Sequence, residues 1–156
     1  MRPVIDSMKE LNAAGSQAMI AAKVHAATDV TGFGLAGHLH EMLEASNVSA
    51  ILDFNALPIF KGAWELACAY CRPGKTFAIM DDLEGSIEQG SLDDDTFDNR
   101  LGVICDPQTS GGMLVTISPE NARIFEEAFE DRTDRRLSPI GQIAKERSGT
   151  IRFADA

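Results

Sequence analysis

The sequence is organised around the stretch Thr28-Asp29-Val30-Thr31-Gly32-Phe33-Gly34-Leu35-Ala36-Gly37-His38-Leu39. The apolar segment Val24-His25-Ala26-Ala27 precedes it and predicts a short buried strand. Apolar residues then recur at helical spacing, at Leu35, Leu39, Met42 and Leu43. The glycines therefore lie where a strand turns into a helix, and the unpaired N–H groups of such a turn form a ready anion site.

The residues of this turn favour binding of a phosphate together with a divalent cation. Gly32 and Gly34 let the backbone come close to a ligand because they carry no Cβ. Thr31 is a suitable N-cap for the helix, and Thr28 is a further candidate ligand. Asp29 would repel a bare phosphate, so its position is explained if Mg²⁺ lies between carboxylate and phosphate. A turn shaped only for close helix–strand packing is a second interpretation.

A dinucleotide site is a third interpretation of the same residues. Gly32-x-Gly34-x-x-Gly37 satisfies the G-x-G-x-x-G fingerprint, and Asp53 follows about twenty residues later, after a predicted strand over 48–53. Two observations count against it. Asp29 has no role beside a pyrophosphate, and the chain after Asp53 does not repeat the βαβ pattern of a doubly wound sheet.

A second glycine-rich loop follows the apolar segment 101–105. It reads Asp106-Pro107-Gln108-Thr109-Ser110-Gly111-Gly112 and precedes a clear strand over 113–117. The loop brings the Asp106 carboxylate and the Thr109 and Ser110 hydroxyls into one turn. From these residues alone, a ligand-binding loop and an ordinary turn before a strand are both open.

Composition narrows the class of protein. With 156 residues, the chain is expected to form one domain over 1–156. No apolar run reaches the length of about 18 residues that a membrane span needs, and no secretory signal is visible. A net charge of −10 argues against nucleic-acid binding. Three cysteines suit a reducing compartment, so a cytoplasmic location is expected, with the Cys68-x-x-Cys71 pair inert.

The remaining pattern predicts an α+β fold, a mixed β-sheet flanked by helices. The acidic segment 81–98, within a loop of about 81–100, is interpreted as solvated and mobile. His38 and His40 point to different faces of their helix, so these two and His25 are assigned structural or surface roles. Further helices are expected over 4–11, 17–22, 32–46, 60–70 and from Ser118 onward, and Asn47 is the expected C-cap of the helix over 32–46. The strands 137–143 and 149–153 are expected to form a terminal hairpin.

Taken together, the motifs at 27–39 and 106–112 closely resemble those of selenophosphate synthetase (selenide, water dikinase), a member of the aminoimidazole ribonucleotide synthetase-like superfamily. The resemblance is to the C-terminal domain of that enzyme and covers about Pro3 to Phe153. It implies the α+β fold of the superfamily's C-terminal domain. It also implies an ATP-dependent enzyme that converts selenide and water to selenophosphate, with AMP and phosphate as co-products.

The resemblance also assigns roles to residues and partners. It makes Asp29 a Mg²⁺ ligand, which agrees with the electrostatic argument above. It places the reactive Cys or selenocysteine, a catalytic Lys and further metal-binding aspartates in an N-terminal domain that this chain lacks. No catalytic residue is therefore expected here, and Cys68, Cys71 and Cys105 do not match the nucleophile. ATP, selenide, the N-terminal domain and a second copy of the full-length protein are the implied partners, and the chain by itself is expected to be inactive.

Overall fold

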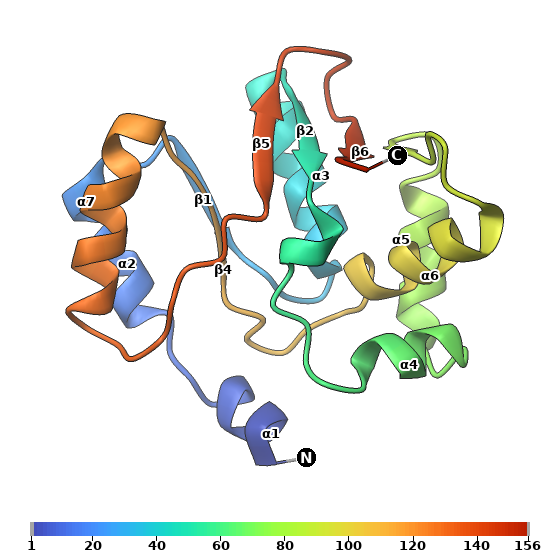
Figure 1. Cartoon of the computed structure of the whole chain (residues 1–156), viewed down its shortest axis with the longest axis horizontal. Helices are drawn as coiled ribbons and strands as arrows, with labels where there is room; N and C mark the ends of the chain where they lie inside the picture. Colours follow the sequence, from blue (N-terminus) through green and yellow to red (C-terminus); the bar gives the residue numbers. More distant parts are fainter. Residues whose placement is uncertain (1, 156) are drawn as a thin grey trace.

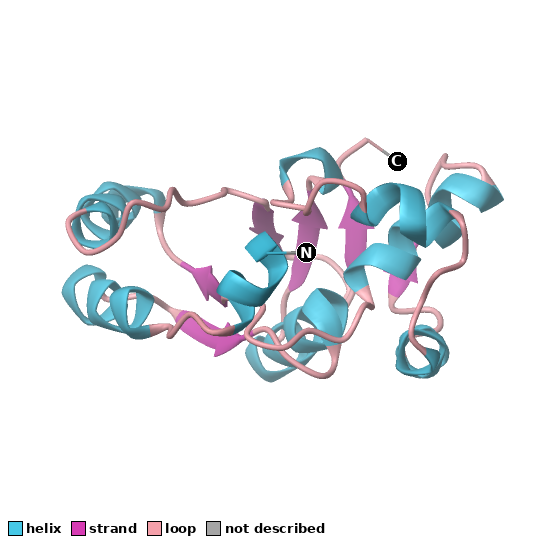
Figure 2. Ribbon diagram, turned by 90° about the horizontal axis from the view of Figure 1, so that it is seen from below, coloured by secondary structure: helices cyan, strands magenta, loops and turns pink. Residues whose placement is uncertain are grey.

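The computed structural model describes residues 2–155 and shows an α+β fold, as predicted. Helices surround strands that run through the middle of the molecule (Figure 1; Figure 2). The elements in chain order are α1 (Arg2–Met8), α2 (Ala13–Ala22), β1 (Ala26–Asp29), α3 (Gly34–Ser46), β2 (Ser49–Leu52), the 3₁₀ helix η1 (Phe54–Ala56), α4 (Ala63–Cys68), α5 (Gly74–Asp82), β3 (Ile87–Glu88), α6 (Asp94–Ile104), β4 (Met113–Thr116), α7 (Pro119–Glu130), β5 (Gly141–Ala144) and β6 (Ile151–Phe153).

The strands form two separate sheets. β1 and β4 make an antiparallel pair in which Asp29 lies opposite Met113. The larger sheet has the order β3-β6-β2-β5, with β6 parallel to both β3 and β2, and β5 antiparallel to β2. This is the mixed sheet that the sequence predicts. Helix α3 contacts β1 and β2 and therefore joins the two sheets.

The main core lies around β6 and α3, where Leu43, Ile151 and Phe153 are fully buried. The Phe153 ring meets the rings of Phe54 and Phe97 edge to face, at centroid distances of 6.1 and 6.3 Å. Such contacts add to the stabilisation that burial of apolar area gives. The core thus holds the start of α3, and with it the glycine-rich turn, in a fixed position.

One charged side chain closes this core. The Arg100 guanidinium lies 5.0 Å from the centroids of both the Phe54 and Phe153 rings, and only 7% of the residue is exposed. Its two terminal nitrogens donate to the two carboxylate oxygens of Asp155, at 2.6 and 2.7 Å. The bidentate ion pair with Asp155 and the contacts with the two aromatic rings replace the hydration that the guanidinium loses on burial.

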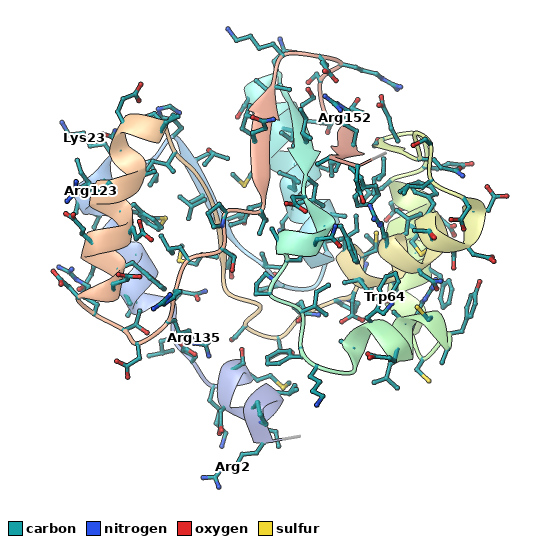
Figure 3. All side chains as sticks on the ribbon, in the orientation of Figure 1. Arg2, Lys23, Trp64, Arg123, Arg135 and Arg152 are labelled. Atoms are coloured by element: carbon teal, nitrogen blue, oxygen red, sulfur yellow. The ribbon has the colours of Figure 1, made fainter. Side chains whose placement is uncertain are left out.

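A smaller apolar cluster lies between α2 and α7, which pack side by side at one end of the molecule (Figure 1). Ala18, Ala22 and Phe125 are its buried members. Arg135, after α7, forms an ion pair with Glu10 and so ties this segment to the turn between α1 and α2 (Figure 3). None of the helices in residues 2–155 has the length and apolar character needed to cross a membrane.

The prediction of a mobile acidic loop over 81–98 is wrong. These residues form the end of α5, the short strand β3 and the first part of α6. Asp93 is the N-cap of α6 and accepts hydrogen bonds from the Thr96 backbone N–H at 2.9 Å and hydroxyl at 2.7 Å. Carboxylates favour a helix N-terminus because they satisfy its free N–H groups and complement its dipole. The acidic run is therefore a helix start.

The predicted terminal hairpin is also wrong. Strand β5 covers only Gly141–Ala144, and β6 does not pair with it, because β2 lies between them. Ile151 and Phe153 are completely buried, which requires an interior position for β6 in the sheet. Sequence proximity favours a hairpin, but long-range pairing of the apolar strand decides the topology.

Several element boundaries also move. The predicted helix over 60–70 shrinks to α4, and the apolar segment 101–105 is the end of α6. The first two predicted helices, over 4–11 and 17–22, are separated as expected, but α1 ends at Met8 and α2 begins at Ala13, so Gly15 lies inside α2. Two terminal signals are confirmed: Asn47 caps α3 in the left-handed conformation, with φ 54°, and Pro119 opens α7 directly after Ser118.

Candidate phosphate and metal turn

The two glycine-rich loops lie against each other and form one surface. The antiparallel pairing of β1 with β4 continues past Asp29, because the Val30 N–H donates to the Gly112 carbonyl at 3.0 Å. The Gly111 N–H in turn donates to the Val30 carbonyl at 2.9 Å. The Gln108 N–H donates to the Thr31 carbonyl, also at 2.9 Å. The sequence motifs 28–34 and 106–112 are thus parts of one site.

The glycines of the site have two different roles. Gly34 has φ +64°, and a Cβ on it would lie 2.8 Å from the Ile104 carbonyl oxygen and 2.9 Å from the Cys105 carbonyl carbon. A Cβ on Gly111 would lie 2.8 Å from the Val30 oxygen. These two glycines permit close packing between the loops. Gly32 is exposed, and a Cβ there would meet nothing within 4 Å, so its backbone faces open space.

Thr31 does not cap the helix, which corrects the sequence prediction. Helix α3 begins at Gly34, and its N-cap is Phe33, which makes no side-chain capping bond. The Thr31 hydroxyl instead lies 3.1 Å from Nε2 of His38. Gly32 and Phe33 lie between Thr31 and the first helical residue, Gly34, and allow the chain to turn before the helix starts. The Thr28 hydroxyl donates a hydrogen bond to the Asp29 backbone carbonyl, at 3.1 Å.

Asp29 stands exposed at the end of β1. Within residues 2–155 its carboxylate takes part in none of the side-chain hydrogen bonds or ion pairs. Both of its oxygens are consequently available to a ligand from solvent. A free carboxylate at the mouth of a turn that presents N–H groups fits the interpretation of a cation held beside a phosphate.

Asp106 lies on the other loop in a half-buried position. Burial raises the pKa of its carboxyl, and the hydrogen bond from the Gln108 side chain, at 2.5 Å to Oδ2, partly opposes that increase. Gln108 therefore contacts both halves of the site, since its backbone N–H bonds Thr31. Thr109 is exposed, and Ser110 adopts a left-handed conformation with φ 52°. The structure thus places all three predicted residues of this loop beside the turn at 28–34.

The donor set fits part of a magnesium shell. Nowhere in residues 2–155 do three His, Cys, Asp or Glu side chains gather closely enough to hold a metal ion. Mg²⁺ retains several waters and is bound by one or two carboxylates together with substrate phosphates. Asp29 can supply one such carboxylate, and the remaining ligands would come from water, phosphate or another polypeptide segment.

The dinucleotide interpretation is wrong on topology. A Rossmann unit needs the strand before the glycine turn and the strand that ends at the acid in the same parallel sheet. Here β1 and β2 belong to different sheets and do not pair. Asp53 has a local role, since its carboxylate accepts the Asn55 N–H at 3.0 Å and caps η1.

Comparisons with known proteins show which family the chain belongs to. Residues 4–154 match the model of the family described as "AIR synthase related protein, C-terminal domain". The chain belongs to this family.

Several curated relatives of this AIR synthase related domain carry the name selenide, water dikinase. The protein of that name from Aeromonas hydrophila is 42% identical over 139 residues, 88% of this chain and 38% of the relative. The relative from Bordetella bronchiseptica is 39% identical over 91% of this chain and 39% of the relative. The relative from Pseudomonas putida is 38% identical over 94% of this chain and 40% of the relative. The chain therefore spans about two fifths of the length of the curated relatives it matches.

The histidines and cysteines of the domain differ in their surroundings. His40 bonds the Gly149 carbonyl at 2.8 Å, which is a structural role, as predicted. His38 was assigned the same kind of role but lies in the site, next to Thr31. Cys105 is fully buried, and burial raises the pKa of its thiol to about 12, so it is an inert core residue. Cys71 is exposed and Cys68 is half-buried.

We expect Gly34→Ala to destabilise this domain strongly, while Gly32→Ala leaves the free energy of unfolding within about 0.5 kcal/mol. Alanine at position 34 costs about 1–2 kcal/mol for the left-handed backbone alone. The overlap with the Ile104 and Cys105 backbone adds to that cost. Urea unfolding of the two variants measures the difference. Equal stability of both variants would show that the loops are not tightly packed at Gly34.

Asp106→Asn should stabilise the domain at neutral pH. A raised carboxyl pKa favours the protonated form in the folded state, so stability is fully present below the unfolded pKa and is lost as pH rises through the folded pKa. Asparagine removes the buried charge and keeps an oxygen for Gln108. The gain in unfolding free energy should be largest at about pH 7 and shrink toward about pH 3. A variant less stable than the parent at neutral pH would contradict this.

Proposed function

We propose that this chain is the C-terminal domain of a longer ATP-dependent selenide, water dikinase, in which it supplies a turn that binds phosphate and Mg²⁺. The observation that carries the proposal is the joining of two distant motifs by backbone hydrogen bonds into one surface with a free carboxylate. The names of the curated relatives supply the reaction class.

In the proposed reaction, ATP, selenide and water give selenophosphate, AMP and phosphate. The part of the relatives that this chain does not match would supply the nucleophile and further metal ligands, in a cytoplasmic protein that forms a homodimer. In this proposal the nucleophile is not one of this chain's cysteines. The role of this chain is to bind and orient the phosphate end of ATP.

Each element of the turn has a defined task in this proposal. The exposed backbone at Gly32 lets a phosphate approach without a steric barrier. Thr28, Thr31, Thr109 and Ser110 add hydroxyls at the rim, and Asp106 adds a carboxyl. Asp29 would hold Mg²⁺, and the ion, when bound, neutralises charge on the phosphate oxygens during transfer.

The electrostatics of the chain explain why a cation is needed. A net charge of −10 repels free ATP. Helix α5 partly compensates for this at the turn, because the Lys75 ammonium lies 4.9 Å from the centroid of the Phe33 ring. Attraction to the ring face holds this cation beside the turn. Asp29 ends β1 and Lys75 lies on α5 against Phe33, so the two residues would offer opposite charges on different elements near the turn.

In the full-length enzyme, Asp29→Asn should reduce selenide-dependent AMP formation about a hundredfold, or about 2.7 kcal/mol of activation free energy. The amide has nearly the same shape but gives a cation one neutral oxygen in place of a carboxylate. The thermal midpoint should not change, since the exposed Asp29 carboxylate makes no side-chain hydrogen bond or ion pair within residues 2–155.

Asp53→Asn is the matched control, because asparagine also caps a 3₁₀ or α-helix start and position 53 lies outside the proposed site. Its turnover should equal that of the parent enzyme. Near-normal turnover of Asp29→Asn at limiting Mg²⁺, with unchanged stability, would remove Asp29 from the site. Loss of the fold in Asp29→Asn would make the carboxylate structural.

A further inference from the structure

His38 connects the glycine-rich turn to a surface carboxylate. It lies in the first turns of α3, and only 8% of the residue is exposed. Its Nε2 atom is 3.1 Å from the Thr31 hydroxyl oxygen, and its Nδ1 atom is 3.6 Å from a carboxylate oxygen of Glu41. The Phe33 ring covers the imidazole in an edge-to-face contact, with 5.7 Å between centroids.

The carboxylate determines which nitrogen carries the proton in neutral His38. A lone pair on Nδ1 would face the negative charge of Glu41, whereas an Nδ1–H group is attracted to it. The neutral ring is then protonated on Nδ1 and bare on Nε2. A bare Nε2 atom accepts a hydrogen bond, so the Thr31 hydroxyl is the donor in the contact between them.

This arrangement fixes what Thr31 offers to a ligand. A hydroxyl has one hydrogen to donate and two lone pairs. If the hydrogen is directed to His38, only lone pairs remain for the open side of the turn. Val30 pairs with Gly111 and Gly112, so the extended backbone of β1 continues past Asp29. Side chains alternate along an extended backbone, and Thr31 and Asp29 therefore lie on the same face. Both residues then present acceptors, which bind cations and the waters around them.

We propose that His38, oriented by Glu41, is a positioning residue that makes Thr31 an acceptor for a hydrated divalent cation at Asp29. This rests on the proposed function, and it assigns Thr31 to the cation and not to the phosphate. His38 acts through Thr31 and touches no ligand itself. Residues in such outer positions typically change metal affinity by about tenfold to a hundredfold.

The first test needs no ligand. Long-range ¹H–¹⁵N correlation spectra of the ¹⁵N-labelled chain, in mildly alkaline buffer where imidazole is ordinarily neutral, report the tautomer of His38. The proposal requires the proton on Nδ1 and an Nε2 atom that accepts a hydrogen bond. Thr31→Val should shift the Nε2 resonance, and Glu41→Gln should increase the other tautomer. A His38 ring protonated on Nε2 in the parent chain would overturn the proposal.

The second test uses MnCl₂ alone, since Mn²⁺ broadens the amide resonances near its site even when it binds weakly. Broadening is expected at Asp29 to Gly32. The apparent Kd for MnCl₂ should rise about tenfold in Thr31→Val and in His38→Leu. It should stay within about threefold in His38→Gln, whose amide oxygen can accept the Thr31 hydrogen. His40→Gln is the matched control, because His40 bonds Gly149 away from the turn.

The outcomes separate this inference from the proposed function. Broadening at the turn with the same Kd in all four variants would overturn the role of Thr31 and His38 and leave the metal site at Asp29 in place. No broadening at the turn in the parent chain would overturn both. If Thr31→Val does not fold, the comparison of His38→Gln with His38→Leu decides alone, since equal affinities would contradict the proposal.

Discussion

The candidate site depends on the backbone hydrogen bonds between Val30, Thr31 and the loop that follows α6. Two segments almost eighty positions apart become one surface because the β1–β4 ladder continues beyond its last regular pair. Gly34 and Gly111 make this possible, since a side chain on either would overlap the backbone of the facing segment. The motif glycines therefore serve the assembly of the site as much as contact with a ligand. Gly32 and Gly112 are left open, since a Cβ on either would meet nothing within 4 Å, and Gly32 marks the place where a phosphate would approach.

Charge gives the same site its chemical character. The chain is strongly acidic, yet the turn carries only a few charged groups: the free Asp29 carboxylate, the half-buried Asp106 and the Lys75 ammonium over Phe33. Burial raises the pKa of Asp106. A divalent ion beside these carboxylates would add positive charge and attract phosphate. The chain belongs to the AIR synthase related C-terminal domain family, and its curated relatives are named selenide, water dikinase.

Local signals in the sequence predicted those parts of the structure that local forces decide. The strand–turn–helix order around Asp29, the left-handed cap at Asn47 and the start of α7 after Ser118 follow from backbone preferences, and all are confirmed. The strand before the turn is not buried, however: β1 covers Ala26–Asp29, and its residues alternate between half-buried and exposed. The acidic segment was misjudged because charge density was taken as a sign of a mobile loop, whereas most of its carboxylates are exposed on regular elements. Asp93 and Thr96 form a capping pair that is visible in the sequence and predicts a helix start. Strand β6 could not be placed in this way, since its neighbours β3 and β2 are distant in the chain.

His38 is the residue of the candidate site that sequence reasoning missed. Helical side chains lean toward the N-terminus of their helix, so a residue four positions after Gly34 reaches back to the turn. That direction, and not the face of the helix, is the signal that identifies it.

The central claim is that the two loops bind phosphate and metal as one unit. Amide spectra of the ¹⁵N-labelled chain, titrated with inorganic pyrophosphate in the presence and absence of MgCl₂, test it most directly. The claim predicts that the amides of Gly32 and of 108–112 shift together, with one apparent Kd, and only when Mg²⁺ is present. Shifts confined to one loop, or shifts of the same size without Mg²⁺, would contradict it.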